Sequence, residues 1–259
     1  MRRDQIADEY HALALINLGD MHGTSGNLAE LDSAKHYVEH ALVRLGLTQP
    51  EEYHLRAQSW SLWGVYAEIV RRYAIRNRDN VSSTVDFSNA RDNSNNAYSG
   101  LVAMLSNPEV AERDRNELET EVARSRLVRG VIDLSQQVIE RRRRLTNFAP
   151  RNLLGAVAIN EAYARLARHR SQQNASLRVH TALLGIAAEH MGSHKGRGGV
   201  WWRRLRQELR WAATHDQNHH AYLQWIALSG VFKLAKLRGA EDLILKGYIS
   251  EPWPTSNPE

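Results

Sequence analysis

Apolar side chains recur at intervals of three and four residues along most of this 259-residue chain, with polar positions between them. This interval is that of one helix face, and no segment alternates apolar and polar residues like a half-buried strand. We therefore expect an all-α fold of nine to eleven helices, packed as antiparallel hairpins. The expected helices cover residues 4–21, 28–47, 50–76, 87–105, 109–145, 151–171, 174–191, 200–214, 217–237 and 239–247.

Six prolines fall between these helical patterns and none falls inside one, as expected because proline interrupts a helix interior. Polar stretches at 23–27, 77–86 and 193–199 predict connections, and residues 251–259 form a Pro-rich tail. The chain is long enough to bury a substantial core, and we expect one helical domain over 1–250. Its parts are hairpins at 1–107, central helices at 108–191 and Arg- and Trp-rich helices at 200–250.

Four glycines follow a leucine or tryptophan inside apolar runs, at Leu18-Gly19, Trp63-Gly64, Leu154-Gly155 and Leu184-Gly185. A glycine inside a helix costs about 1 kcal/mol relative to alanine. This cost is offset where the missing side chain lets a neighbouring helix approach closely. We therefore expect these glycines at helix–helix contacts.

The N-terminal part resembles the tetratricopeptide-repeat family over roughly residues 12–105. Leu18-Gly19 is followed by Ala34, Val38 and Ala41 at the family's spacing of small residues, although the linker is longer than its 34-residue unit allows. A second, degenerate unit comprises Trp60, Trp63-Gly64, Ala90 and Ala97. The resemblance implies an α-solenoid whose concave face, lined by the first helix of each hairpin, binds a peptide, a helix or another subunit. An irregular helix bundle is the alternative.

Composition excludes several kinds of chemistry. The chain has no cysteine, so disulfides, thiolate nucleophiles and cysteine-ligated metals are ruled out. It lacks a phosphate-binding loop and a nucleophile elbow, so we expect no cofactor and no catalytic residue. Its beginning lacks a signal-peptide core, and no run approaches the roughly 20 apolar residues of a membrane span. We expect a cytoplasmic protein without a membrane partner.

Two histidine clusters are candidates for metal binding. His36 and His40 belong to an H-x-x-E-H pattern one helical turn apart. Val38 belongs to the apolar stripe, which places this pair on the solvent side, and no third ligand is evident. The second cluster supplies weak candidates in His215 and His219, at a helix boundary where Asp216 or Asn218 is suited to cap the following helix.

Basic residues are mostly arginine, with 29 Arg against 5 Lys. Codon usage in a GC-rich, bacterial genome explains this bias, and so does recognition of phosphates or carboxylates. The segment 195–211 holds six basic residues and one acid. We expect an apolar stripe and an arginine ridge on different faces of its helix, the second suited to a nucleic acid or an acidic protein. The alternative is a solvated basic face, partly neutralised by Glu140 and Glu208. The candidate contacts are Lys195, Arg197, Arg203, Arg206 and Arg210, with a second cluster at Arg141, Arg142, Arg143 and Arg144.

Seven tryptophans mostly fall on apolar stripes, which predicts core packing. Candidate partner contacts are Trp60, Trp63, Trp202 and Trp253, the last flanked by two prolines. The function that we favour is a non-catalytic scaffold or adaptor that binds another protein. The alternative is a nucleic-acid-associated subunit that uses the arginines, and the third hypothesis is a histidine-based metalloenzyme. The oligomeric state stays open.

Overall fold

A computed structural model describes residues 28–48, 53–76, 82–107, 112–144, 154–192 and 198–247. Throughout these ranges the regular structure is helical, which confirms the all-α prediction. The helices are α2 (Leu28–Thr48), α3 (Tyr53–Arg76), α4 (Ser82–Leu105), α5 (Glu112–Arg144), α6 (Leu154–Arg168), α7 (Ala175–Met191), α8 (Gly198–His215), α9 (Gln217–Leu234) and α10 (Gly239–Lys246). The expected helix at 4–21 and the turn at 23–27 lie outside the described residues.

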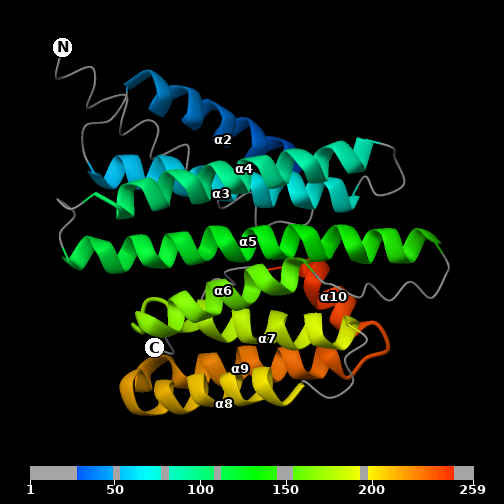
Figure 1. Ribbon diagram of the computed structural model, residues 1–259. Helices are drawn as coiled ribbons and strands as arrows, with labels where there is room; N and C mark the ends of the chain where they lie inside the picture. The colour runs from blue at the N-terminus through cyan, green and yellow to red at the C-terminus, as the bar shows by residue number, and fades with distance from the viewer. Residues whose placement is uncertain are drawn as a thin grey trace, which may run out of the picture.

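The described helices form two groups, one on either side of the long helix α5 (Figure 1). Helices α2, α3 and α4 lie on one side of α5, and α6 to α9 lie on the other. Consecutive helices pack on each other, as hairpins do, while α10 returns to contact α5, α7 and α9. As a result, α2 lies at one end of the stack and the α8–α9 pair at the other. The repeat resemblance stays a prediction.

Helix α4 begins earlier than its sequence predicts. Residues 77–86 are expected to form a connection, yet α4 starts at Ser82. The asparagines of α4 are poor helix formers. Other positions of the helix form a buried face that includes Phe87, Ala90, Ala97 and Leu101. Most of a helix's stability comes from such packing rather than from intrinsic propensity, so the helix extends further than propensity suggests.

Glycines mark several helix–helix contacts, as predicted. A Cβ atom on Gly155 of α6 would overlap the carbonyl oxygen of Gly130 in α5, and one on Gly185 of α7 would overlap the ring of Trp201 in α8. Gly64 of α3 also faces a neighbouring helix, but with more room, because its added Cβ would lie 3.9 Å from that of Ala97. The close-packing prediction is therefore confirmed for Gly155 and Gly185. It is wrong for Gly64, where a side chain has room, and Gly19 lies outside the described residues.

Candidate interaction surface at the α8–α9 end

Helix α8 separates its apolar and basic residues as predicted. Trp201, Leu205 and Ala212 are buried on one side, while Arg203, Arg206 and Arg210 are exposed on another. The Nε atom of Arg203 donates to the carbonyl oxygen of Gly199 at 3.0 Å, which aligns this side chain along its own helix. The arginine ridge is thus an outer surface of the molecule.

Glu208 is buried and does not neutralise that ridge, so its assignment to the solvated face is wrong. Only 1% of its side chain is exposed. Arg178 of α7 donates to its carboxylate at 2.6 Å, and Tyr163 of α6 donates at 2.7 Å. Arg170 adds a third contact at 3.1 Å. These bonds fix α8 against α6 and α7.

The buried network shifts the pKa of two of its members. Burial lowers the pKa of Arg178, although the nearby Glu208 charge acts in the opposite direction. Burial and the hydrogen bond to Glu208 raise the pKa of Tyr163. The Arg178 guanidinium also lies over the Trp211 ring, 4.3 Å from its centroid. The position of Glu208, three residues after Leu205 and four before Ala212, is the sequence signal that marks it as inward-facing.

Helix α9 exposes apolar side chains on its outer face. Leu223 and Ile226 are buried, whereas Trp225 is 53% exposed, Leu228 59% and Phe232 73%. These three exposed residues form the α9 stripe, and their spacing of three and four places them on one helix face. Trp225 is exposed, so the prediction that it packs in the core is wrong.

The exposed charges of α8, α9 and the turn that follows α9 are all positive. The segment 198–238 contains two acidic residues, Glu208 and Asp216, and both are buried. All charged side chains that are exposed in this segment are therefore basic. They are Arg203, Arg206, Arg210, Lys236 and Arg238.

The tryptophans proposed as partner contacts lie elsewhere and are half-buried. Trp60 packs with the cluster around Leu101, and its ring occupies the space that a side chain at position 100 would need. Trp63 meets the Tyr66 ring edge-on at 6.3 Å, and Trp202 packs against the C-terminal core. Trp253 lies outside the described residues.

The second arginine cluster is partly neutralised. Arg142 donates to Glu241 and to Asp242, each at 2.9 Å, and Arg141 lies 3.8 Å from Glu241. Both acids belong to the first turn of α10, so this cluster joins α5 to α10. Arg143 is exposed. Lys195, Arg197 and the Arg144 side chain lie outside the described part.

Each histidine proposed as a metal ligand contacts a neighbouring side chain. The ring centroids of His36 and His40 lie 4.3 Å apart on the exposed side of α2. His215 stacks on Trp211 with ring centroids 5.0 Å apart. Nδ1 of His219 lies 2.8 Å from a carboxylate oxygen of Asp216. Within the described ranges, no group of three or more potential ligands is placed to hold a metal ion.

Asp216 occupies the N-cap position of α9, but its side chain makes no capping hydrogen bond. The helix boundary therefore falls at Asp216 rather than at Asn218, which lies inside α9. The predicted capping hydrogen bond is wrong for Asp216, because its carboxylate contacts His219 instead of the helix backbone. None of the described helices combines the length and the apolar character that a membrane span requires.

No protein-family model, curated protein or solved structure matches the chain.

Proposed function

We propose that this chain is a non-catalytic helical scaffold or adaptor that binds a partner protein through the α9 stripe. The observation that carries the proposal is the exposure of Trp225, Leu228 and Phe232 side by side on the last long helix of the stack. Exposed apolar residues are ordinary when scattered, but contiguous ones with a polar rim are typical of interaction sites. Their position differs from the concave groove that the repeat resemblance implies.

The energetics support a protein-binding role. Burying a large apolar side chain contributes about 1.5–3 kcal/mol, so covering three of them gives a substantial driving force. Tryptophan at the centre of an interface is a frequent hot spot. The Glu208 network fixes α8, which packs against α9, and a preorganised surface loses less entropy when it binds.

The charges around the stripe favour an acidic, amphipathic partner segment. Arg210 of α8, together with Lys236 and Arg238 in the turn after α9, provides exposed positive charge at the same end of the molecule as the stripe. This combination matches a segment that carries acids beside apolar residues. A second copy of this chain would bring the same positive rim, and like charges at an interface are repulsive. We therefore propose a different protein as the partner.

Quantitative capture from a lysate of the source cells tests this proposal. Wild type is compared with a Trp225→Ser, Phe232→Ser double variant, and we expect at least a tenfold loss of one specific protein. The matched control changes Val43 and Val157 to Ser, since both are similarly exposed, at 62% and 59%, on other helices. Equal capture by wild type and the stripe variant, with both folded by circular dichroism, contradicts the proposal.

Nucleic-acid binding is the second candidate, and the exposure of Arg203, Arg206 and Arg210 on one face of α8 favours it. Each phosphate contact releases counterions, so affinity should fall steeply with salt. A labelled 20-nucleotide RNA or DNA provides the probe. Replacing the three arginines by Ala should weaken binding and lower the magnitude of the salt slope by about two for this single-stranded probe. The control replaces Arg76, Arg124 and Arg168, which are also exposed; equal losses in the two variants contradict this candidate.

A further inference from the structure

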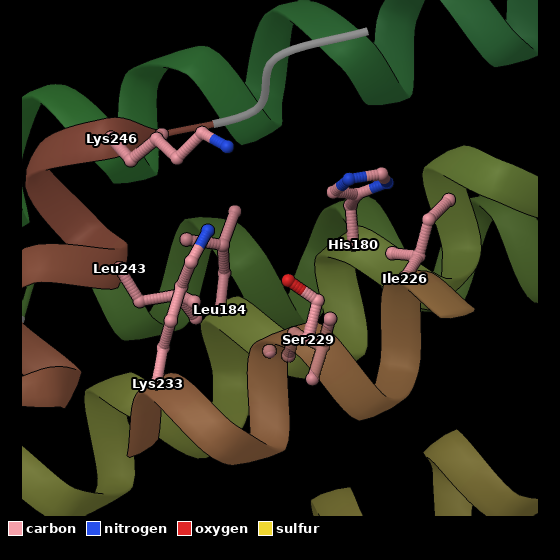
Figure 2. Close-up of a pocket in the computed structure, with 10 residues that line it drawn as sticks. His180, Leu184, Ile226, Ser229, Lys233, Leu243 and Lys246 are labelled. Carbon is pink, nitrogen blue, oxygen red and sulfur yellow. The ribbon is translucent and has the colours of Figure 1, made fainter. Parts of the chain in front are cut away.

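An open hollow lies between α7, α9 and α10, next to the α9 stripe. Its lining includes the apolar side chains of Leu183, Leu184, Ile226 and Leu243, which we call its floor. Figure 2 shows these elements converging, with side chains from all three helices directed into one space. The hollow is therefore a meeting point of segments far apart in the chain.

Polar side chains line the rim of this hollow, and none of them is acidic. They are His180 of α7, Ser229 and Lys233 of α9, and Lys246 of α10. Figure 2 shows these polar side chains around the same space as Leu184, Ile226 and Leu243. Nδ1 of His180 lies 2.9 Å from the carbonyl oxygen of Ser176; since a carbonyl accepts, this nitrogen carries the proton. The hollow thus combines an apolar base with donors and positive charge, which suits a carboxylate attached to an apolar segment.

Gly247 is both the end of α10 and part of the wall of the hollow. Buried Arg71 of α3 donates to the carbonyl oxygen of Leu245 at 3.0 Å and to that of Lys246 at 3.4 Å. Gly247 has a φ of 69°, a conformation that favours glycine. A Cβ atom there would also lie 2.6 Å from Nη2 of Arg71. The chain is therefore held firmly where it leaves the hollow.

The segment 248–259, which follows Gly247 and lies outside the described residues, has the complementary composition. It contains Tyr248, Ile249 and Trp253 as apolar groups, Glu251 and Glu259 as acids, and no Lys, Arg or His. Glu251 follows Gly247 by four residues, a reach of about 14 Å in extended chain. The carboxylate of Glu251 is thus tethered within reach of the rim.

We propose that segment 248–259 folds back and docks in this hollow, with Glu251 contacting Lys233 and Lys246 and its apolar side chains covering the floor. Tethering raises the effective concentration of such a segment to about the millimolar range, so modest complementarity is sufficient. Pro252 and Pro254 restrict the free segment and reduce the entropy lost on docking. This contact is independent of the proposed partner site, because it uses the face of α9 beside the stripe.

Carbodiimide crosslinking of the full chain tests the proposal, because this reagent joins an amine to a carboxylate only when the two are in contact. We expect a Glu251 link to Lys233 or Lys246 in peptide mass spectra. Lys35 and Glu39, whose charged atoms lie 3.8 Å apart, provide an internal positive control. Lys236, in the turn after α9, provides the negative one. Recovery of the Lys35–Glu39 link without a Glu251 link to either lysine overturns the proposal.

Two further measurements distinguish docking from other origins of the link. An equal mixture of ¹⁴N- and ¹⁵N-labelled chains should give only links within one chain. Links between differently labelled chains overturn the proposal in favour of contact with a second copy. The Trp253→Ala variant should lower the yield of the Glu251 link at least threefold and leave the Lys35–Glu39 link unchanged. An unchanged Glu251 yield in this variant contradicts apolar docking.

Discussion

The two ends of the helical stack present different outer faces. At one end, the exposed side chains that the structure describes in α2 include Asp32, His36 and His40, together with the small apolar residues Ala29 and Val43. At the other end, α9 exposes Trp225, Leu228 and Phe232. Because α2 shows that this fold accepts a polar outer face on an end helix, the apolar face of α9 requires a reason of its own. A binding role supplies that reason.

The regions beneath these two faces also differ. Three small apolar clusters fill the space among α2, α3, α4 and α5. A single larger cluster joins α5 through α10, and the buried Glu208 and Arg178 pair lies among these C-terminal helices. The apolar end therefore rests on the region whose helices are held by a buried charge network.

The largest expected effect is loss of the carboxylate in Glu208→Ala. Removing one partner of a buried ion pair leaves the other charge uncompensated, so the free energy of unfolding should fall by about 3–5 kcal/mol. Urea denaturation measures this change. The control is Glu121→Ala, whose partly exposed carboxylate pairs with Arg124 at 3.1 Å; we expect a loss of about 1 kcal/mol or less. Equal losses in the two variants refute a special role for the network.

A smaller effect, of opposite sign in the two regions, should follow from replacing glycine by alanine. Gly155→Ala forces α6 away from Gly130 and should cost about 1–3 kcal/mol. Gly64→Ala meets only an ordinary contact with Ala97 and should stabilise the chain by up to about 1 kcal/mol through helix propensity. Thermal unfolding distinguishes the two. A stabilising Gly155→Ala variant would show that α5 and α6 are not in close contact.

Alkaline pH should weaken the C-terminal network. The pKa of Tyr163 is raised in the folded chain, so above pH 10 the unfolded chain loses a proton that the folded chain keeps. Stability is therefore fully present below about pH 10 and falls above it, by at most about 1.4 kcal/mol per pH unit for this group. Urea denaturation between pH 9 and 11 should show a shallower loss in Tyr163→Phe than in wild type. Parallel pH profiles contradict this assignment.

The smallest effect is expected at the polar end. His36→Ala and His40→Ala replace exposed side chains of α2, so each should change the free energy of unfolding by less than about 0.5 kcal/mol. Neither should alter capture of the partner. A loss of capture in either variant would show that the α2 face, and not the α9 stripe alone, contacts the partner.

Helix periodicity predicts most of the fold because each helix buries one side. The arginine ridge on α8 follows from the same rule, since Arg203, Arg206 and Arg210 alternate with buried Trp201 and Leu205. The pattern is less informative in α4, where burial of Phe87 and Ala90 outweighs the low helix propensity of the asparagines.

The apolar periodicity of one helix does not show which side chains of other helices it contacts. Glu208 is stabilised inside the protein because Arg178 and Tyr163 reach it from two other helices, and the partners of a charge cannot be located by its own periodicity. Trp225 is mispredicted for a related reason. Helix α9 is apolar on two faces, and only the arrangement of α7, α8 and α10 decides which face is covered.

Hydrogen exchange of the chain, alone and bound to the protein that it captures, tests the central claim most directly. We predict that binding slows amide exchange in α9 around residues 222–232 by at least tenfold and leaves α2 unchanged, because the α9 stripe is the proposed contact surface. Protection of α2 without protection of α9, or failure to capture any protein that distinguishes wild type from the stripe variant, would contradict the account.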